Sequence, residues 1–294
     1  MEVFMARVAY QTRAGWLSGM MGIVIFSGSL PATRLAVMDF DPVFLTVARA
    51  AIAGCLALAI LLVSKPVRPQ KSQWTSLLVV AGGVVVGFPL LTALALEHIS
   101  SARSIVFIGL LPLATAIFGM LRGGERPRPV FWLFSVLGSV LVAGFAAIGS
   151  EPGALSGDLY MLGAVIVCGL GYAEGGKLSR HLGGWQVICW ALVISLVPMV
   201  ILCGLTLPDS TDAIGLSAWL GLGYVSLFSM LIGFFFWYRG LALGGIATVG
   251  QLQLLQPFMG LMLASMILAE PVSWAMIVVT LAVVLCVAGA KKFA

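Results

Sequence analysis

Charged residues are scarce in this sequence, and their scarcity fixes the class of protein. Of the 294 residues, 9% are charged and 61% are hydrophobic, and the mean hydropathy is +1.12. A soluble domain needs more polar surface than this composition can supply. The sequence therefore predicts a membrane protein that crosses the bilayer several times.

Several kinds of chemistry are missing as well. The chain has 2 histidines, both at predicted helix ends, and no His-x-x-x-His or Cys-x-x-Cys sequence, so nothing predicts a metal site or a membrane protease. The 5 cysteines fall within predicted membrane segments, and their odd number gives no disulfide framework. No nucleophile and base occur together at one depth. An intramembrane enzyme is therefore the least supported hypothesis, and no cofactor is expected.

One short motif imitates a nucleotide-binding loop. The residues from Gly171 to Lys177 fit G-x-x-x-x-G-K. A phosphate loop needs Ser or Thr next, to bind magnesium, and a strand before it, but Leu178 follows and no strand precedes. Direct coupling to ATP is therefore not expected.

Hydrophobic runs long enough to cross a hydrocarbon core of about 30 Å recur along the whole chain. They predict an all-α membrane protein with no residues left over for a soluble domain. The first run is about a full span, which favours a retained helix over a cleaved signal peptide. The ten predicted transmembrane helices cover residues 14–36, 42–64, 73–96, 101–121, 130–149, 158–179, 185–206, 216–238, 246–269 and 272–290.

The basic residues gather on alternate connections between these helices. With both termini in the cytoplasm, only Arg34 and Arg103 fall on the outer side, and Arg49 falls inside a helix. This distribution obeys the positive-inside rule, so the net charge of +5 indicates topology and not a nucleic-acid surface. The cytoplasmic basic residues are Arg7, Arg13, Lys65, Arg68, Lys71, Arg122, Arg126, Arg128, Lys177, Arg180, Arg239, Lys291 and Lys292.

The sequence also matches itself after a shift of 145 positions. Pro112 then falls on Pro257 and Glu125 on Glu270, and Leu96, Ala102 and Leu110 fall on Leu241, Ala247 and Leu255. The match indicates two copies of one unit, at residues 1–149 and 157–294. Each copy holds five predicted helices, and an odd number forces the second copy into the membrane in the opposite orientation. Such inverted repeats enclose one midplane site between two related gates in transporters.

Two charged residues fall well inside predicted membrane helices, away from the helix ends. Glu174 is the only acid predicted well inside one, which favours a coupling or substrate-contacting carboxylate. The alternative for Glu174 is a structural ion pair with Lys177 or Arg180. Arg49 either faces a cavity or extends its side chain to the outer interface.

Polar and aromatic residues complete the candidate site. The amides of the ninth segment cost too much to face lipid, and Pro257 removes the helical donor to the Gln253 carbonyl, so these groups are expected to face inward, as contacts between helices or as a ligand site. Trp237 and Tyr238 are typical of an interfacial aromatic belt. By depth and polarity, the residues predicted to line a substrate cavity are Ser29, Phe88, Phe107, Tyr172, Glu174, Trp237, Gln251 and Gln253.

Further features recur in both copies. Arg34 and Lys177 close the first helix of each copy, a proline lies within each fourth helix, and Gly124-Glu125 and Ala269-Glu270 end those helices. This pattern resembles the EamA-type carriers of the drug/metabolite transporter superfamily, and within it the YddG branch of aromatic amino acid exporters. The resemblance implies a basket-like helical bundle with a central substrate cavity built from both halves, in the bacterial inner membrane.

The leading hypothesis is an inner-membrane transporter that exports aromatic and other neutral amino acids and related metabolites by alternating access. The alternative is a multidrug or cationic-metabolite exporter of the same fold, because aromatic residues and Glu174 could hold an organic cation. The expected partners are a small-molecule substrate and the lipid bilayer, without nucleic acid, and a monomer is compatible with the sequence.

Overall fold

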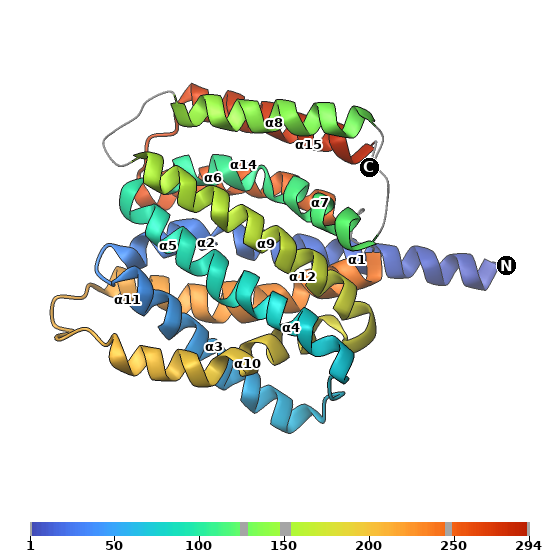
Figure 1. Ribbon diagram of the computed structural model, residues 1–294, viewed down its shortest axis with the longest axis horizontal. Helices are drawn as coiled ribbons and strands as arrows, with labels where there is room; N and C mark the ends of the chain where they lie inside the picture. The colour runs from blue at the N-terminus through green and yellow to red at the C-terminus, as the bar shows by residue number, and fades with distance from the viewer. Residues whose placement is uncertain (1, 124–128, 148–153, 245–248, 293–294) are drawn as a thin grey trace.

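The computed structural model describes residues 2–123, 129–147, 154–244 and 249–292, and every element in these ranges is helical (Figure 1). The elements are α1 (Glu2–Ser27), α2 (Ser29–Val37), α3 (Pro42–Ser64), η1 (Lys71–Gln73), α4 (Trp74–Val80), η2 (Ala81–Gly87), α5 (Phe88–His98), α6 (Ser101–Ile108), α7 (Leu111–Gly123), α8 (Pro129–Ala147), α9 (Ala154–Leu182), α10 (Gly184–Leu205), α11 (Leu216–Tyr224), η3 (Val225–Ile232), α12 (Gly233–Gly244), η4 (Gly250–Leu255), α14 (Gln256–Leu268) and α15 (Trp274–Lys292).

In the described part of each of the ten predicted segments, the chain forms a helix or a run of consecutive helical elements. Within the described ranges, seven helices are long and apolar enough to cross a membrane, and two shorter apolar helices cover Leu252–Leu268 and Trp274–Cys286. The chain is therefore a multi-pass membrane protein. Helix α1 begins and α15 ends at the same end of the bundle (Figure 1).

The helix starts follow from local sequence. Asp41 precedes α3, and its carboxylate accepts hydrogen bonds from the backbone N–H groups of Val43 at 2.8 Å and Phe44 at 3.0 Å. Pro42 occupies the first helical position, where a missing N–H costs nothing. Ser100 caps α6 in the same way, by accepting a hydrogen bond from the N–H of Arg103 at 3.1 Å.

Several helices are interrupted, and two kinds of interruption recur at corresponding places of the two halves. The π-helical segment η2 lies between α4 and α5, and a shift of 145 residues carries it onto η3, which is also π-helical. The break between α6 and α7 likewise corresponds to the junction of η4 with α14, and a proline follows each break. The same shift carries the bounds of α8 onto those of α15.

The contacts between elements follow the same correspondence. Helix α1 packs along α12, and the equivalent pair, α9 and α5, also packs together. Helix α3 contacts its counterpart α10, and α8 contacts its counterpart α15 along one edge of the bundle (Figure 1). The centre of the bundle is therefore built by elements from both halves.

Glycines allow two of these helices to approach closely. A Cβ atom on Gly83 of η2 would lie 2.5 Å from the carbonyl oxygen of Val167, and one on Gly171 of α9 would lie 2.7 Å from a methyl carbon of Val84. Small residues are common where membrane helices meet, because apolar side chains gain little by leaving lipid for one another. The G-x-x-x-G spacing of Gly83 and Gly87 thus marks a real helix contact.

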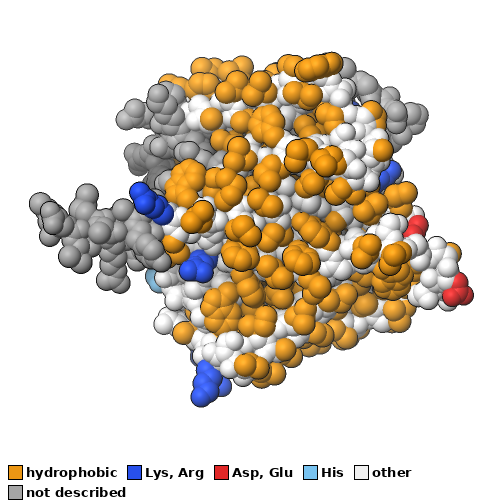
Figure 2. Space-filling model, turned by 180° about the vertical axis from the view of Figure 1, so that it is seen from behind, with side chains coloured by type: hydrophobic (Ala, Val, Ile, Leu, Met, Phe, Trp, Pro, Cys, Tyr) orange, Lys and Arg blue, Asp and Glu red, His pale blue; other side chains and the backbone are white. Residues whose placement is uncertain are grey.

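The surface has the character that a bilayer requires. Hydrophobic side chains cover the face shown in Figure 2, most of its visible Lys and Arg side chains lie toward one end, and Asp and Glu lie at the other. Large apolar side chains such as Leu62, Val197 and Leu285 are each more than 60% exposed, which is costly in water and favourable in lipid.

Two polar contacts join the halves on the predicted outer side. Arg103 of α6 donates to both carboxylate oxygens of Asp158 of α9, at 2.9 and 2.6 Å, and its guanidinium lies 5.0 Å from the ring centre of Phe145. Glu270, after α14, accepts hydrogen bonds from the N–H groups of Ser101 and Ala102 at the start of α6. Glu125, which was predicted to correspond to Glu270, lies outside the described residues.

Candidate functional site: a central cavity between the halves

A small cavity lies at the centre of the bundle, where both halves contribute walls. Its volume is about 20 Å³, enough for roughly one water molecule. In this conformation the side chains of the wall leave no room for anything larger, so a larger occupant requires the surrounding helices to move apart. The lining residues are Phe26, Ser29, Leu30, Arg49, Val84, Phe88, Tyr172, Ser229, Phe234 and Gln256.

One wall of the cavity is polar. Arg49 of α3 is 4% exposed, and one of its terminal nitrogens lies 3.4 Å from the hydroxyl oxygen of Ser229, a long contact. The Ser229 and Ser29 hydroxyls form a hydrogen bond of 2.7 Å. The Arg49 Nε and the Gln256 Oε1 are both buried without a hydrogen-bond partner.

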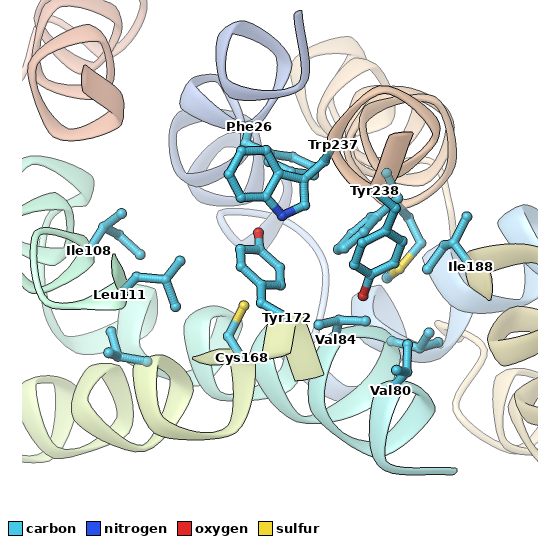
Figure 3. Packing of buried hydrophobic residues seen from close by; sticks show 14 of the residues in the cluster. Phe26, Val80, Val84, Ile108, Leu111, Cys168, Tyr172, Ile188, Trp237 and Tyr238 are labelled. Atoms are coloured by element: carbon cyan, nitrogen blue, oxygen red, sulfur yellow. The ribbon is translucent and has the colours of Figure 1, made fainter. Parts of the chain in front are cut away.

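Another part of the wall is aromatic. Phe26 and Phe234 have ring centres 5.0 Å apart, and Tyr172 meets Phe234 edge-on at 5.9 Å. Trp237 packs behind Tyr172, with ring centres 5.7 Å apart, and the two side chains point toward each other in Figure 3. Such offset and edge-on pairs are favourable beyond the area that they bury.

The π-helical segments place two of the wall residues. Val84 lies in η2 and Ser229 in η3, and a shift of 145 residues relates these two positions. A π-helical turn has an extra residue relative to the α-helix, and such turns are frequent at functional sites. The same distortion in both halves thus faces the same cavity.

A third distortion positions Gln256. Pro257 has no N–H, so the carbonyl of Gln253 loses its α-helical donor. The chain compensates with the 3₁₀ segment η4, in which the N–H of Gln256 donates to the Gln253 carbonyl. Gln256 then begins α14 with its side chain in the cavity wall.

Three of the residues predicted to line a substrate cavity do lie in this wall: Ser29, Phe88 and Tyr172. Trp237 is fully buried against Tyr172, so the interpretation of Trp237 and Tyr238 as an interfacial belt is wrong. Both rings fill space between helices, and Gly175 leaves room for the ring of Tyr238.

The other predicted residues lie elsewhere. Phe107 and Gln253 are buried, at 2% and 1% exposed, but neither is in the wall of the central cavity. Glu174 is 2% exposed and accepts a hydrogen bond of 2.8 Å from the hydroxyl of Ser76. The side chain of Gln251 lies outside the described residues.

Ser76 connects Glu174 with a second, larger hollow. This hollow has a volume of about 450 Å³ and lies on the predicted cytoplasmic side. Its wall contains Ser76, Arg68, Lys177 and His181. A hollow with several basic side chains attracts anions toward the bundle.

Two wall residues show what sequence reasoning missed. The sequence did not decide whether the Arg49 side chain faces a cavity or reaches the outer interface. Its exposure of 4% excludes the interface. Ser229 carries no signal of its own, because serine is common in membrane helices. The repeat could have pointed to it. Ser229 corresponds to Val84, which lies one turn before Phe88, a residue already predicted to line the cavity.

A multi-pass helical bundle whose two halves share a buried, partly polar cavity has the architecture of a membrane transporter. The sequence model of the EamA-like transporter family matches residues 13–146 and again residues 155–290. The chain belongs to the EamA-like transporter family.

A curated relative agrees with this assignment, and a solved structure shares the fold. The chain is 67% identical over 284 residues to the "Uncharacterized transporter YdeK" of Bacillus subtilis (strain 168), a match that covers 97% of this chain and 99% of that protein. A solved crystal structure, 21% identical in sequence, matches the fold with a TM-score of 0.65 over 95% of this chain and 96% of its own.

Proposed function

We propose that this protein exports amino acids, aromatic and other neutral ones, and related small metabolites across the cell inner membrane by alternating access at the central cavity. The observation that carries the proposal is a buried cavity with a polar and an aromatic wall, shared by the two halves. A polar or charged group deep in a membrane protein is costly, so such groups usually mark functional sites.

The proposal includes ten transmembrane helices in two inverted five-helix repeats, residues 1–149 and 157–294, with both termini in the cytoplasm. Three observations support it. The family model matches twice, the π-helical segments recur at related positions, and helix contacts recur between related pairs. Two related halves around one site can open alternately to either side.

The interrupted helices supply the points of movement. A π-helical or 3₁₀ segment has weaker hydrogen-bond geometry than an α-helix, so it bends at lower cost. η2, η3 and the junction of η4 with α14 all border the cavity. Bending there would enlarge the cavity toward one side while the other remains closed.

The alternative substrate class, organic cations, has less support. It depended on aromatic residues together with Glu174, and Glu174 is not in the wall of the central cavity. The charged residue in that wall is Arg49, whose positive charge would repel a cation.

The experiment is solute flux in proteoliposomes with a panel of labelled amino acids and organic cations. We expect the wild type to move amino acids faster than empty liposomes do. Ser229→Trp should abolish flux because an indole ring cannot fit beside Arg49 in so small a cavity. Phe228→Trp is the matched control, because Phe228 lies on the same segment but is 44% exposed. Wild-type flux equal to that of empty liposomes across the whole panel would refute the proposal.

A further inference from the structure

The central cavity contains two unsatisfied hydrogen-bonding groups of opposite kind. The Nε of Arg49 is a donor and the Oε1 of Gln256 is an acceptor, and each is buried without a partner. Both residues line the cavity, and they are 4% and 7% exposed. Buried polar groups in proteins are nearly always satisfied, so a pair left open in one cavity calls for an explanation.

The charge of Arg49 makes the case stronger. The ion pair found within the described ranges joins Arg103 to Asp158, and Arg49 has no carboxylate beside it there. The polar contact that its guanidinium makes is the long, 3.4 Å approach to the neutral hydroxyl of Ser229. A buried guanidinium with no anion is unfavourable, and its planar N–H groups fit a carboxylate well.

We infer that Arg49 and Gln256 together recognise a small carboxylic acid that carries a hydrogen-bond donor close to its carboxylate, as amino acids and hydroxy acids do. Arg49 binds the carboxylate. The amide oxygen of Gln256 accepts from the neighbouring amino or hydroxyl group. The inference rests on the proposed transport function and names the chemistry of its substrate.

The remaining walls agree with this assignment. Phe26, Phe88 and Phe234 offer an apolar surface for the rest of the substrate. The hydrogen-bonded Ser29 and Ser229 hydroxyls lie at the polar wall, where either can turn toward a carboxylate oxygen. Since the cavity of about 20 Å³ cannot hold an amino acid, the substrate enters a more open conformation and the walls then close on it.

The test uses three compounds with one aromatic body: phenylalanine, 3-phenylpropionate without the amino group, and phenethylamine without the carboxylate. Binding to the purified full-length protein is measured in detergent by calorimetry, apart from any transport assay. We expect phenylalanine to bind best, 3-phenylpropionate more weakly, and phenethylamine at least about 30-fold more weakly than phenylalanine, because loss of one partner of a buried charged contact is expensive.

Three variants separate a binding role from a structural one. Arg49→Met keeps an unbranched chain as far as the position of Nε but removes the guanidinium charge. It should abolish carboxylate binding while leaving the unliganded protein as heat-stable or more so, since it removes a buried unpaired charge. Arg49→Lys keeps the charge and should retain part of the affinity. It therefore tests the role of Arg49 in binding even if Arg49→Met fails to fold. Gln256→Leu should lower the affinity for phenylalanine and leave that for 3-phenylpropionate unchanged.

Several results would overturn the inference. They are equal binding of phenethylamine and phenylalanine, unchanged discrimination in the Arg49 variants, or no binding of any carboxylate to the wild type. If the protein transports organic cations in proteoliposomes and any of these results is also found, the protein is still a transporter and only the carboxylate site is refuted. Absence of all flux, with carboxylate binding retained, would instead remove the transport proposal.

Discussion

The carboxylate of Glu270 lies against the first turn of α6, where it accepts hydrogen bonds from both the N–H and the hydroxyl of Ser101, at 3.0 and 2.9 Å. It also accepts from the N–H of Ala102 at 2.7 Å. The residue that follows the end of α14 thus caps the start of α6. A negative charge at this position also complements the helix dipole.

Glu270→Gln should therefore lower stability. The amide keeps one acceptor oxygen but loses the charge and the second acceptor, so we expect a loss of about 1–2 kcal/mol in the free energy of unfolding. Glu97→Gln is the control, because Glu97 is exposed. Thermal unfolding of the purified protein in detergent measures both, and equal midpoints for the two variants would contradict the capping role.

The contact between η2 and α9 predicts a difference between two adjacent glycines. Gly83→Ala should destabilise the protein by about 1–3 kcal/mol, because its Cβ would meet the Val167 carbonyl oxygen. Gly82→Ala should be neutral or stabilising by up to about 1 kcal/mol, since nothing lies within 4 Å of its Cβ and alanine favours a helix. The same thermal assay applies, and a loss of stability in Gly82→Ala as large as that in Gly83→Ala would show that the close approach is not the cause.

The ion pair between Arg103 and Asp158 predicts strong coupling. The side chains are 11% and 4% exposed, so removing either partner leaves a buried charge unpaired. We expect Arg103→Gln and Asp158→Asn each to cost about 3–5 kcal/mol, and the double variant to cost much less than the sum. A double-mutant cycle of unfolding free energies measures this coupling, and additive losses would indicate that the pair is not a unit.

High salt gives an independent check on the same pair. Because the two side chains are almost fully buried, added salt should hardly change the coupling energy, whereas an exposed pair weakens as ionic strength rises. The cycle is repeated at low and high salt. A coupling that falls to near zero in high salt would place the pair in contact with solvent.

The sequence was a good guide to where the helices lie, for a physical reason. In lipid the backbone must satisfy its own hydrogen bonds, so long apolar runs are constrained to be helical. The effect of Pro257 could also be predicted, because the missing N–H has a local consequence that packing does not change. The structure shows that consequence as the 3₁₀ segment η4.

The π-helical segments could not be predicted in this way. η2 is rich in glycine whereas η3 has none, and the two segments share few residue types, so no common composition marks the distortion. The distortion depends on how the neighbouring helices pack, which single-sequence patterns do not report. The repeat does show which positions of the two halves correspond, so a distortion known in one half predicts one at the equivalent position in the other.

The site was only partly predictable, because depth and polarity do not fix rotation about a helix axis. Depth and polarity placed Ser29 and Tyr172 at the cavity, and both lie in its wall. Glu174 has a similar depth but turns toward Ser76. Arg49 was ambiguous because a long side chain reaches several ångströms along the membrane normal, and only packing decides its direction.

Ser229 offers the most direct test of the central claim, that one cavity is reached from both sides of the membrane in turn. A single cysteine is introduced as Ser229→Cys after the 5 native cysteines are replaced. A membrane-impermeant, negatively charged thiol reagent is then applied to membrane vesicles of each orientation. Ser226→Cys is the control, because Ser226 is buried on the same segment outside the cavity wall.

We expect Ser229→Cys to be modified from either side and protected by a bound carboxylate substrate, while Ser226→Cys stays unmodified. Modification from one side only, or from neither, would contradict alternating access at the central cavity.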